Sequence, residues 1–219
     1  MELCLFITAR GPVPAPAVLD PLLAAVPGLA RALVHRAAST HDPYLHDGAP
    51  PDLALQFYFT EITALEAACA GPLQALAPLL AGALVAQQAM LARSFPVPEP
   101  APLDGEHCTY LVAYDGPAED LSAWLGHYLA HHPPIMARFP GIRALEICTR
   151  LDVVNPLPFP HATCMQRNKV VFDSTAALTA ALNSPVRHEM RADYAQLPPF
   201  TGAVTHFPML TRGLTKARK

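Results

Sequence analysis

The chain has 219 residues, of which 52% are apolar and 15% are charged, so it is long and apolar enough to fold around a sizeable core. Its formal net charge is -3, and no basic cluster precedes the last few residues, which argues against a nucleic acid partner. The five cysteines are an odd number without a CxxC pair, which argues against a disulfide framework and a zinc knuckle.

No segment has the pattern of a targeting signal or a membrane span. The opening stretch, MELCLFITARGP, places an acid before a short apolar run, without the cationic start of a secretory signal. The longest apolar run, residues 75–86, contains Pro78 and Gly82 and falls short of the roughly 20 residues that cross a bilayer. We therefore expect a cytoplasmic protein with no membrane partner.

Prolines divide the chain into two units. Four of the 25 prolines fall in PVPEPAP, residues 96–102, just before a new apolar segment begins. A segment of this composition is extended and semi-rigid. We predict a first unit over residues 1–95, a linker over 96–105, a second unit over 106–211 and a basic tail over 212–219.

The two units read as copies of each other at a constant offset of 113 residues. PGLARALVHRA begins at Pro27 and PGIRALEICTR at Pro140, while FTEITALEAACAGP begins at Phe59 and FDSTAALTAALNSP at Phe172. The two blocks align at this offset without a gap between them. The constant offset is stronger evidence for an internal repeat than the alanines that the blocks share. We expect the same order of elements in both units.

The elements are most clearly marked in the second unit. The pattern predicts a strand over 107–114, a helix over 118–132 closed by Pro133 and Pro134, strands over 142–151 and 165–172, helices over 174–183 and 185–194, and a last strand over 202–208. The resulting order, β-α-β-β-α-β, is that of a ferredoxin-like unit with both helices on one face of an antiparallel sheet.

This arrangement leaves the other face of each sheet uncovered, and the second copy is its natural cover. We predict an α+β fold of two tandem ferredoxin-like repeats whose antiparallel sheets pack into one α/β barrel, with the helices outside and an interior that holds a small ligand. The chain would then be an internal pseudo-dimer, and a homodimer stays open. The alternative is two separate ferredoxin-like domains, each pairing with another chain.

Two motifs carry a resemblance to a known family. The run YLAHHPPIMARFPG from Tyr128 resembles the signature of the EthD-like family, whose histidine falls on His132 and whose proline falls on Pro134. NSPVRHEMRADYAQLPPFTG is similar to a second family mark, in which a helix ends in Asp before Pro-x-Phe-Thr. The resemblance covers roughly residues 108–208. It implies a dimeric α/β barrel linked to breakdown of small organic compounds or to polyketide processing. The chain departs from the family by joining two copies, of which the first lacks the His-x-Pro segment.

His132 and Tyr128 are the candidate catalytic residues. They lie four residues apart, which places them on one helix face. At a helix end the dipole would favour a proton on the imidazole, and a histidine beside a phenol can move protons to and from a bound acid or enol. The alternative is a solvated helix end with Tyr128 in the core.

Other polar residues are candidates for binding a substrate. An arginine that points into the barrel would suit a carboxylate or phenolate, whereas Lys169 could equally face water. The candidate substrate-binding residues are His131, Arg143, Arg167, His188 and His206. His127 and His131 have a spacing that can hold zinc, but no acidic residue completes a set, so we expect no metal and no cofactor. His35, His41 and His46 lie in a stretch that reads as a surface loop.

Two functions follow from these observations. The first is a cofactor-independent lyase or isomerase that acts on a small, mostly apolar organic compound, with His132 as acid or base and Tyr128 as its orienting partner. The second is a barrel protein that binds such a compound without chemistry. No GxSxG, GxxxxGK or GxGxxG pattern points elsewhere.

Overall fold

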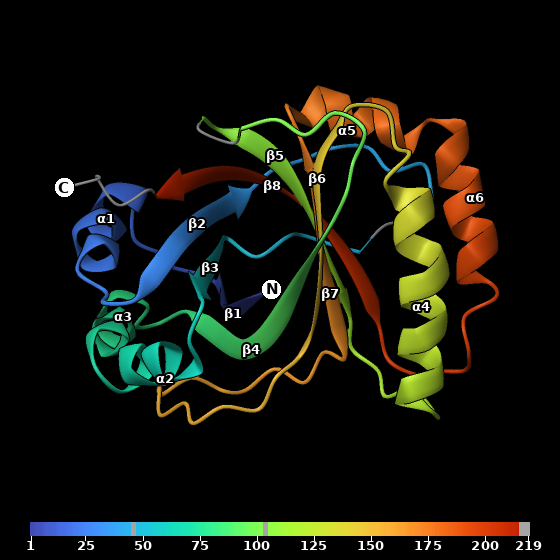
Figure 1. Cartoon of the computed structure of the whole chain (residues 1–219). Helices are drawn as coiled ribbons and strands as arrows, with labels where there is room; N and C mark the ends of the chain where they lie inside the picture. Colours follow the sequence, from blue (N-terminus) through green and yellow to red (C-terminus); the bar gives the residue numbers. More distant parts are fainter. Residues whose placement is uncertain (45–46, 103–104, 215–219) are drawn as a thin grey trace.

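The computed structural model describes residues 1–44, 47–102 and 105–214. Eight strands close into an antiparallel barrel in the order β1-β3-β2-β8-β5-β7-β6-β4, with the helices outside (Figure 1). The strands are β1 (Glu2–Arg10), β2 (Leu29–Ala37), β3 (Leu53–Phe59), β4 (Leu84–Phe95), β5 (His107–Tyr114), β6 (Ile142–Arg150), β7 (Gln166–Phe172) and β8 (Val204–Leu214). The helices are α1 (Pro16–Ala24), α2 (Ile62–Ala70), the 3-10 helix η1 (Pro72–Ala75), α3 (Leu76–Leu79), α4 (Leu121–Met136), α5 (Thr175–Leu182) and α6 (Pro185–Tyr194).

Each half has the expected ferredoxin-like order. The first half contributes the neighbours β4-β1-β3-β2 and the second contributes β8-β5-β7-β6. The pairs β2–β8 and β4–β6 join the halves and close the barrel. In Figure 1, α1 to α3 cover the sheet of the first half, and α4 to α6 cover the sheet of the second. The predicted single barrel is confirmed.

Corresponding strands of the two halves begin 113 residues apart. β2 begins at Leu29 and β6 at Ile142, while β3 begins at Leu53 and β7 at Gln166. The preceding glycines, Gly28 and Gly141, have φ angles of 69° and 73°. A side chain would strain this left-handed conformation, so glycine allows the same turn into the strand in both halves.

The prediction that Pro133 and Pro134 end the helix at residue 132 is wrong. Helix α4 continues through both prolines to Met136. A proline has a helix-compatible φ, and its carbonyl still accepts a hydrogen bond, as Pro133 does from the Ala137 N–H at 2.8 Å. Packing of Pro133 and Met136 in the core accompanies the continued turn. His132 therefore lies one turn inside the helix rather than at its exposed end.

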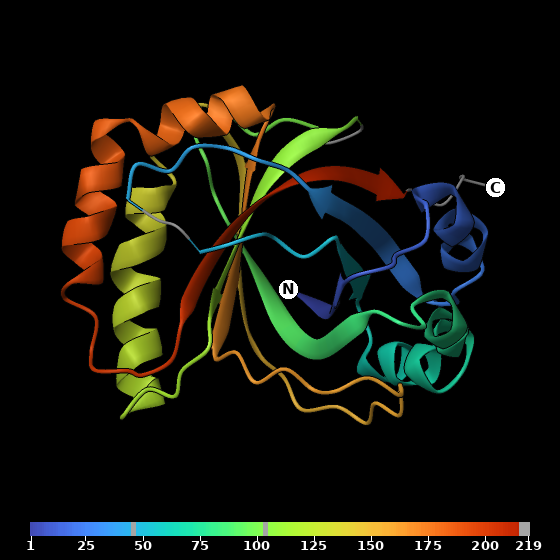
Figure 2. The same cartoon turned by 180° about the vertical axis from the view of Figure 1, so that it is seen from behind.

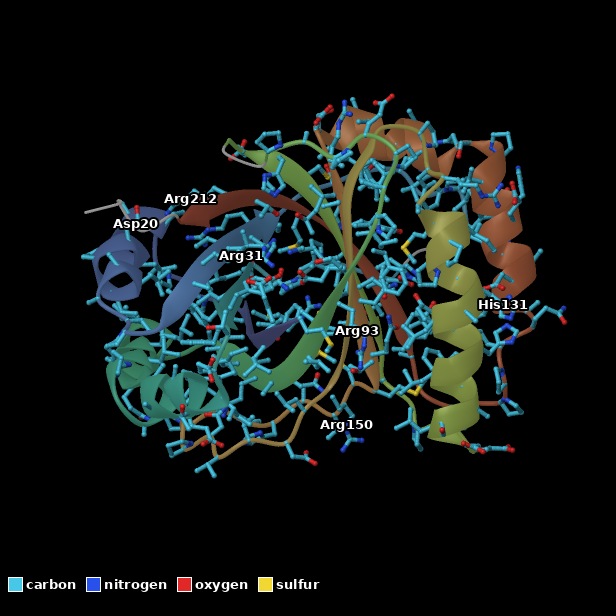
Figure 3. All side chains as sticks on the ribbon, in the orientation of Figure 1. Asp20, Arg31, Arg93, His131, Arg150 and Arg212 are labelled. Atoms are coloured by element: carbon cyan, nitrogen blue, oxygen red, sulfur yellow. The ribbon has the colours of Figure 1, made fainter. Side chains whose placement is uncertain are left out.

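Two boundaries of the expected units fall at strand ends. β4 ends at Phe95 and β5 begins at His107, on either side of the expected linker, of which residues 103–104 lie outside the described range. Residues 212–214, expected to begin a tail, instead extend β8 and pair with β2. Arg212 also forms an ion pair with Asp20 of α1 at 2.6 Å, and both residues are labelled in Figure 3. Residues 215–219 lie outside the described range.

A pocket of about 210 Å³, lined among others by Arg10, Arg167 and Phe207, lies at one end of the barrel. Side chains fill the rest of the barrel, so the predicted ligand cavity is confined to that end of the barrel. An apolar group lies at its centre, composed of Cys4, Phe6, Leu33, Tyr58, Met90, Ala92 and Cys148. Lys169 and Glu146 are each 3% exposed and pair with each other at 3.2 Å. Lys169 therefore does not face water, because the second sheet closes over this strand face.

The expectation that the first-half histidines lie on the surface is wrong for His35. This residue belongs to β2, is fully buried, and lies between Thr211 Oγ1 at 2.8 Å and Gln56 Oε1 at 2.9 Å. Burial lowers the pKa of His35 to about 3, so the ring is neutral. His41 is exposed, and His46 lies outside the described residues.

Each half sends a long connection over the other half. The first crossover connects β2 to β3, and its described residues, 38–44 and 47–52, run to the helices of the second half and back, as Figure 2 shows in blue and cyan. The second crossover, residues 151–165 between β6 and β7, runs beneath α2 of the first half in Figure 2.

Within the described residues, no single helix is long and apolar enough to cross a membrane. Helix α2 and the η1–α3 segment pass the same test of length and hydropathy only as a pair, which is bent by 43°.

Candidate functional site

A cavity of about 330 Å³ lies in the second half, between the sheet and its helices. Its wall is formed by Tyr110, Val112, Tyr114, His132, Met136, Phe139, Asn168, Val170, Phe172, Leu178, Leu182, Arg187, Met190, Arg191, Tyr194, Ala195, Val204 and His206. The cavity thus lies near the carboxyl end of α4. It lies on the helix side of the sheet, however, and not inside the barrel.

The corresponding layer of the first half is packed. Leu157 and Phe159 of the second crossover belong to the core that α1 and α2 form with the sheet of the first half. The first crossover brings polar residues to the second half instead, among them Asp42, Tyr44 and Asp47. The exchange of crossovers therefore fills one layer with apolar side chains and leaves the other with a cavity.

His132 and Asp193 form a buried pair at the cavity wall. His132 Nδ1 lies 2.6 Å from Asp193 Oδ2, and the two side chains are 5% and 10% exposed. Helix α4 supplies the histidine, and the last turn of α6 supplies the aspartate. Because Nδ1 donates to the carboxylate, Nε2 is the basic nitrogen of a neutral ring. This is the arrangement of an oriented general base.

The environment of His132 keeps its ring neutral near pH 7. Burial lowers the pKa of His132 below its ordinary value of 6.5, and the electrostatic interactions with His206 and Arg187 act in the same direction. The bond to Asp193 opposes this shift but does not outweigh it. The expected helix-dipole effect is replaced by desolvation, because the helix continues beyond His132.

Tyr128 lies behind His132 rather than on the cavity wall. Its ring is fully buried and lies 4.7 Å from the His132 ring, measured between ring centres. Its hydroxyl oxygen accepts a hydrogen bond from Asn168 Nδ2 at 2.7 Å, and Asn168 does line the cavity. Burial raises the pKa of Tyr128. Asp193, and not Tyr128, is thus the residue that orients His132 by a hydrogen bond.

Helix α6 gives the cavity a positively charged wall. Arg187 and Arg191 are four residues apart and both line the cavity. Arg187 Nη2 lies 3.0 Å from Asp42 Oδ2, and the side chains are 11% and 7% exposed. Tyr110 donates to the same carboxylate oxygen at 3.0 Å. The first crossover is therefore bound to the cavity wall through Asp42.

His206 is placed on the cavity wall, as the binding prediction requires. Its Nδ1 lies 2.8 Å from Asp47 Oδ2, and its backbone N–H donates to the same oxygen at 2.8 Å. Its ring lies 5.7 Å from that of Tyr110, measured between centres. A second contact thus binds the first crossover to the second half.

The other predicted binding residues lie away from the cavity. His131 is exposed on the side of α4 that faces away from the sheet (Figure 3). His188 is also exposed and lies 3.0 Å from the Tyr44 hydroxyl. Arg143 forms ion pairs with Asp173 at 2.8 Å and Glu99 at 3.0 Å outside the barrel.

Arg167 points to the barrel side of its strand, where it lines the pocket at the end of the barrel rather than the cavity that His132 lines. Its Nε donates to Gln88 Oε1 at 3.2 Å, and its guanidinium lies 5.3 Å from the centre of the Phe6 ring. Within residues 1–44, 47–102 and 105–214, no group of three or more His, Cys, Asp or Glu side chains is placed to hold a metal ion.

The charged residues of the site that sequence reasoning missed include Asp193, Arg187, Arg191 and Asp42. Asp193 is the helix-ending aspartate of the second motif, so that motif contains a signal for it. Arg187 and Arg191 share a helix face with Tyr194, which a helical plot of this segment would show. Asp42 has no comparable signal, because it lies in a connection of the other half.

Solved structures share this fold. A protein described as anthrone oxidase-like has a TM-score of 0.62 and 14% identity over 99% of this chain and 95% of its own. A "putative monooxygenase" from Lactobacillus acidophilus has a TM-score of 0.57 and 11% identity over 98% of this chain and 96% of its own. Another from Fusobacterium nucleatum has a TM-score of 0.59 and 7% identity over 96% and 91%. No family model and no curated protein sequence matches the chain. At these identities the likeness shows the fold alone.

Proposed function

We propose that this chain is an enzyme of the EthD-like type, in which His132 removes a proton from a small, mostly apolar organic compound. The observation that carries the proposal is the 2.6 Å bond between His132 Nδ1 and Asp193 Oδ2 at the wall of a largely apolar cavity. Asp193 holds the imidazole in one orientation and tautomer, so that Nε2 can accept a proton from a bound substrate. The chain thus supplies its own base.

The fate of the deprotonated substrate defines the reaction. Return of the proton at another atom makes the enzyme an isomerase, and loss of a leaving group makes it a lyase. Reaction of the same carbanion with dioxygen is a second candidate, favoured by the fold neighbours that are named monooxygenase and anthrone oxidase-like. A binding protein without chemistry needs the cavity but has no need for the oriented base.

Proton removal can be tested without knowledge of the later steps. Aromatic ketones and enolisable acids that fit the cavity would be incubated with the protein in D2O, and exchange at the acidic carbon followed by NMR. We expect exchange with the wild type and about 10- to 100-fold slower exchange with Asp193→Asn, since the amide neither fixes the tautomer nor stabilises the imidazolium. The matched control is Asp173→Asn, which removes an exposed carboxylate that pairs with Arg143. Binding without exchange across the panel would contradict the proposal and favour the binding protein.

The pH dependence of this exchange follows from the pKa of His132. The active base is the neutral ring, and burial lowers the pKa of His132 below 6.5. The rate should therefore be level near pH 7 and fall only as the pH drops below 6.5, where the ring takes up a proton in the free enzyme. A rate profile of exchange between pH 4.5 and 8, corrected for the uncatalysed reaction, measures this. A fall that begins well above pH 7 would mean that another group is the base.

A further inference from the structure

The wall of the cavity carries its charge on two arginines, because the His132 ring is neutral. It contains two arginines and two histidines, and no aspartate or glutamate among its lining residues. The histidines have their carboxylate partners behind the wall, in Asp193 and Asp47. A ligand that enters the cavity therefore meets an apolar surface with cationic groups at one side.

Arg187 has donor capacity that the protein does not use. One arm of its guanidinium pairs with Asp42, but Nε is buried and has no hydrogen-bond partner among the described residues. A buried donor without a partner costs free energy, so the pair with Asp42 does not satisfy the Arg187 guanidinium completely. Asp42 itself is already occupied, because it accepts from the Tyr110 hydroxyl and the Tyr44 N–H as well.

Arg191 adds a second cation beside Arg187. Its guanidinium lies 4.4 Å from the centre of the Tyr44 ring, and none of the ion pairs within the described residues includes it. Arg187 lies 5.6 Å from the same ring centre. Arg187 and Arg191 lie on adjacent turns of α6, and within the described residues only Arg187 of the two pairs with a carboxylate. Arg191 therefore offers a guanidinium that a ligand carboxylate can share with Arg187.

We propose that the cavity recognises an organic anion, namely an apolar body that carries a carboxylate, and that Arg187 binds this carboxylate with Arg191 beside it. The inference rests on the cavity of the proposed function and names its substrate class. In this arrangement the apolar body lies against Val170, Phe172 and Met190, and the carboxylate lies at α6. Asp42 positions Arg187 from the first half, so the site is built from both halves of the chain.

Binding of matched probes tests this recognition without any turnover. The affinities of 2-naphthoate and its neutral isostere 2-naphthamide would be measured by calorimetry for the full chain. We expect the wild type to bind the carboxylate about 10-fold or more tightly than the amide, since charge-assisted bonds to arginine are stronger than neutral ones. Equal affinities, or no binding of either probe at millimolar concentration, would overturn the inference.

Variants of the charged pair separate recognition from simple anchoring of the crossover. Arg187→Gln should weaken 2-naphthoate by about 10-fold and leave 2-naphthamide within twofold. Asp42→Asn should act in the opposite direction and strengthen 2-naphthoate, because the guanidinium loses its competing carboxylate while Asn can still accept from Tyr110. The control Arg138→Gln removes an arginine that pairs with Glu189 on the surface and should change neither affinity.

If Arg187 only anchored the crossover, both Arg187→Gln and Asp42→Asn would weaken the two probes alike, and that result would refute the assignment. A failure here is distinct from a failure of the proposed function. Deuterium exchange on neutral ketones tests His132 alone, whereas the ratio of carboxylate to amide affinity tests Arg187 alone.

Discussion

Replacing His132 by alanine is expected to lower turnover by about two to four orders of magnitude, the usual contribution of a positioned general base. The structure adds a consequence for folding. His132 is 4% exposed and partners a carboxylate that is itself 10% exposed, so alanine leaves Asp193 buried without its partner. His132→Gln is therefore the better variant, because its amide can still donate to Asp193 but cannot act as a base. Turnover rates per folded molecule, with folding checked by circular dichroism, measure the contribution of His132 to catalysis.

Tyr128→Phe is the comparison for this loss. It keeps the ring that packs on His132 and removes only the hydroxyl that accepts from Asn168. We expect a smaller effect than for His132→Gln, because Tyr128 does not reach the cavity and acts through its neighbours. Wild-type turnover in His132→Gln would remove the histidine from the mechanism. An equal loss in both variants would mean that the tyrosine takes part directly.

The secondary structure of the second half could be predicted well from local pattern. The strand predicted over 107–114 agrees with β5 at both ends, since a short run rich in β-branched and aromatic residues ends there before a Gly-Pro pair. Ser174 accepts from the Ala177 N–H at 3.2 Å and begins α5 as expected. The error at Pro133 has a tertiary cause, because the last turn of α4 packs against the core and tolerates the lost N–H donors.

The face of the sheet that bears the cavity could not be predicted. All seven residues of β3 are buried, and β7 has six buried residues in seven. With both faces covered, alternation of polar and apolar residues no longer distinguishes the barrel side from the helix side. An inward-pointing charge was expected to mark the ligand-binding face of the sheet. Glu146 and Lys169 instead pair with each other inside the barrel, and the cavity that His132 lines is on the opposite face of the sheet.

The contacts that complete the candidate site join distant parts of the chain. Asp193 lies 61 residues after His132, and Arg187 lies 145 residues after Asp42. No local spacing relates such pairs, so their meeting depends on the packing of α6 on α4 and on the course of the first crossover. The two EthD-like motifs contain His132 and Asp193, respectively. Neither motif indicates which side chains contact each other in the fold.

The charged group inside the barrel gives the largest expected effect on stability. Glu146 Oε2 lies 3.2 Å from Lys169 Nζ and 3.1 Å from Arg31 Nη2, and Glu146 Oε1 accepts from the Tyr58 hydroxyl at 2.6 Å. Arg31, which Figure 3 labels, also pairs with Glu2 at 2.7 Å. Burial alone would raise the pKa of Glu146, but attraction by Lys169 and Arg31 outweighs burial and lowers it below 4.5. The carboxylate is thus ionised and holds the two cations together.

Glu146→Gln should lower the free energy of unfolding by about 3–5 kcal/mol, because it leaves the Lys169 ammonium buried without a carboxylate. Arg31 loses less, since Glu2 remains as its partner. The double variant Glu146→Gln with Lys169→Met should recover much of this loss, because the unpaired charge is removed together with its partner. Urea denaturation of the wild type, both single variants and the double variant measures the coupling. A double variant no more stable than Glu146→Gln alone would show that the loss comes from packing around Tyr58 and not from the unpaired ammonium.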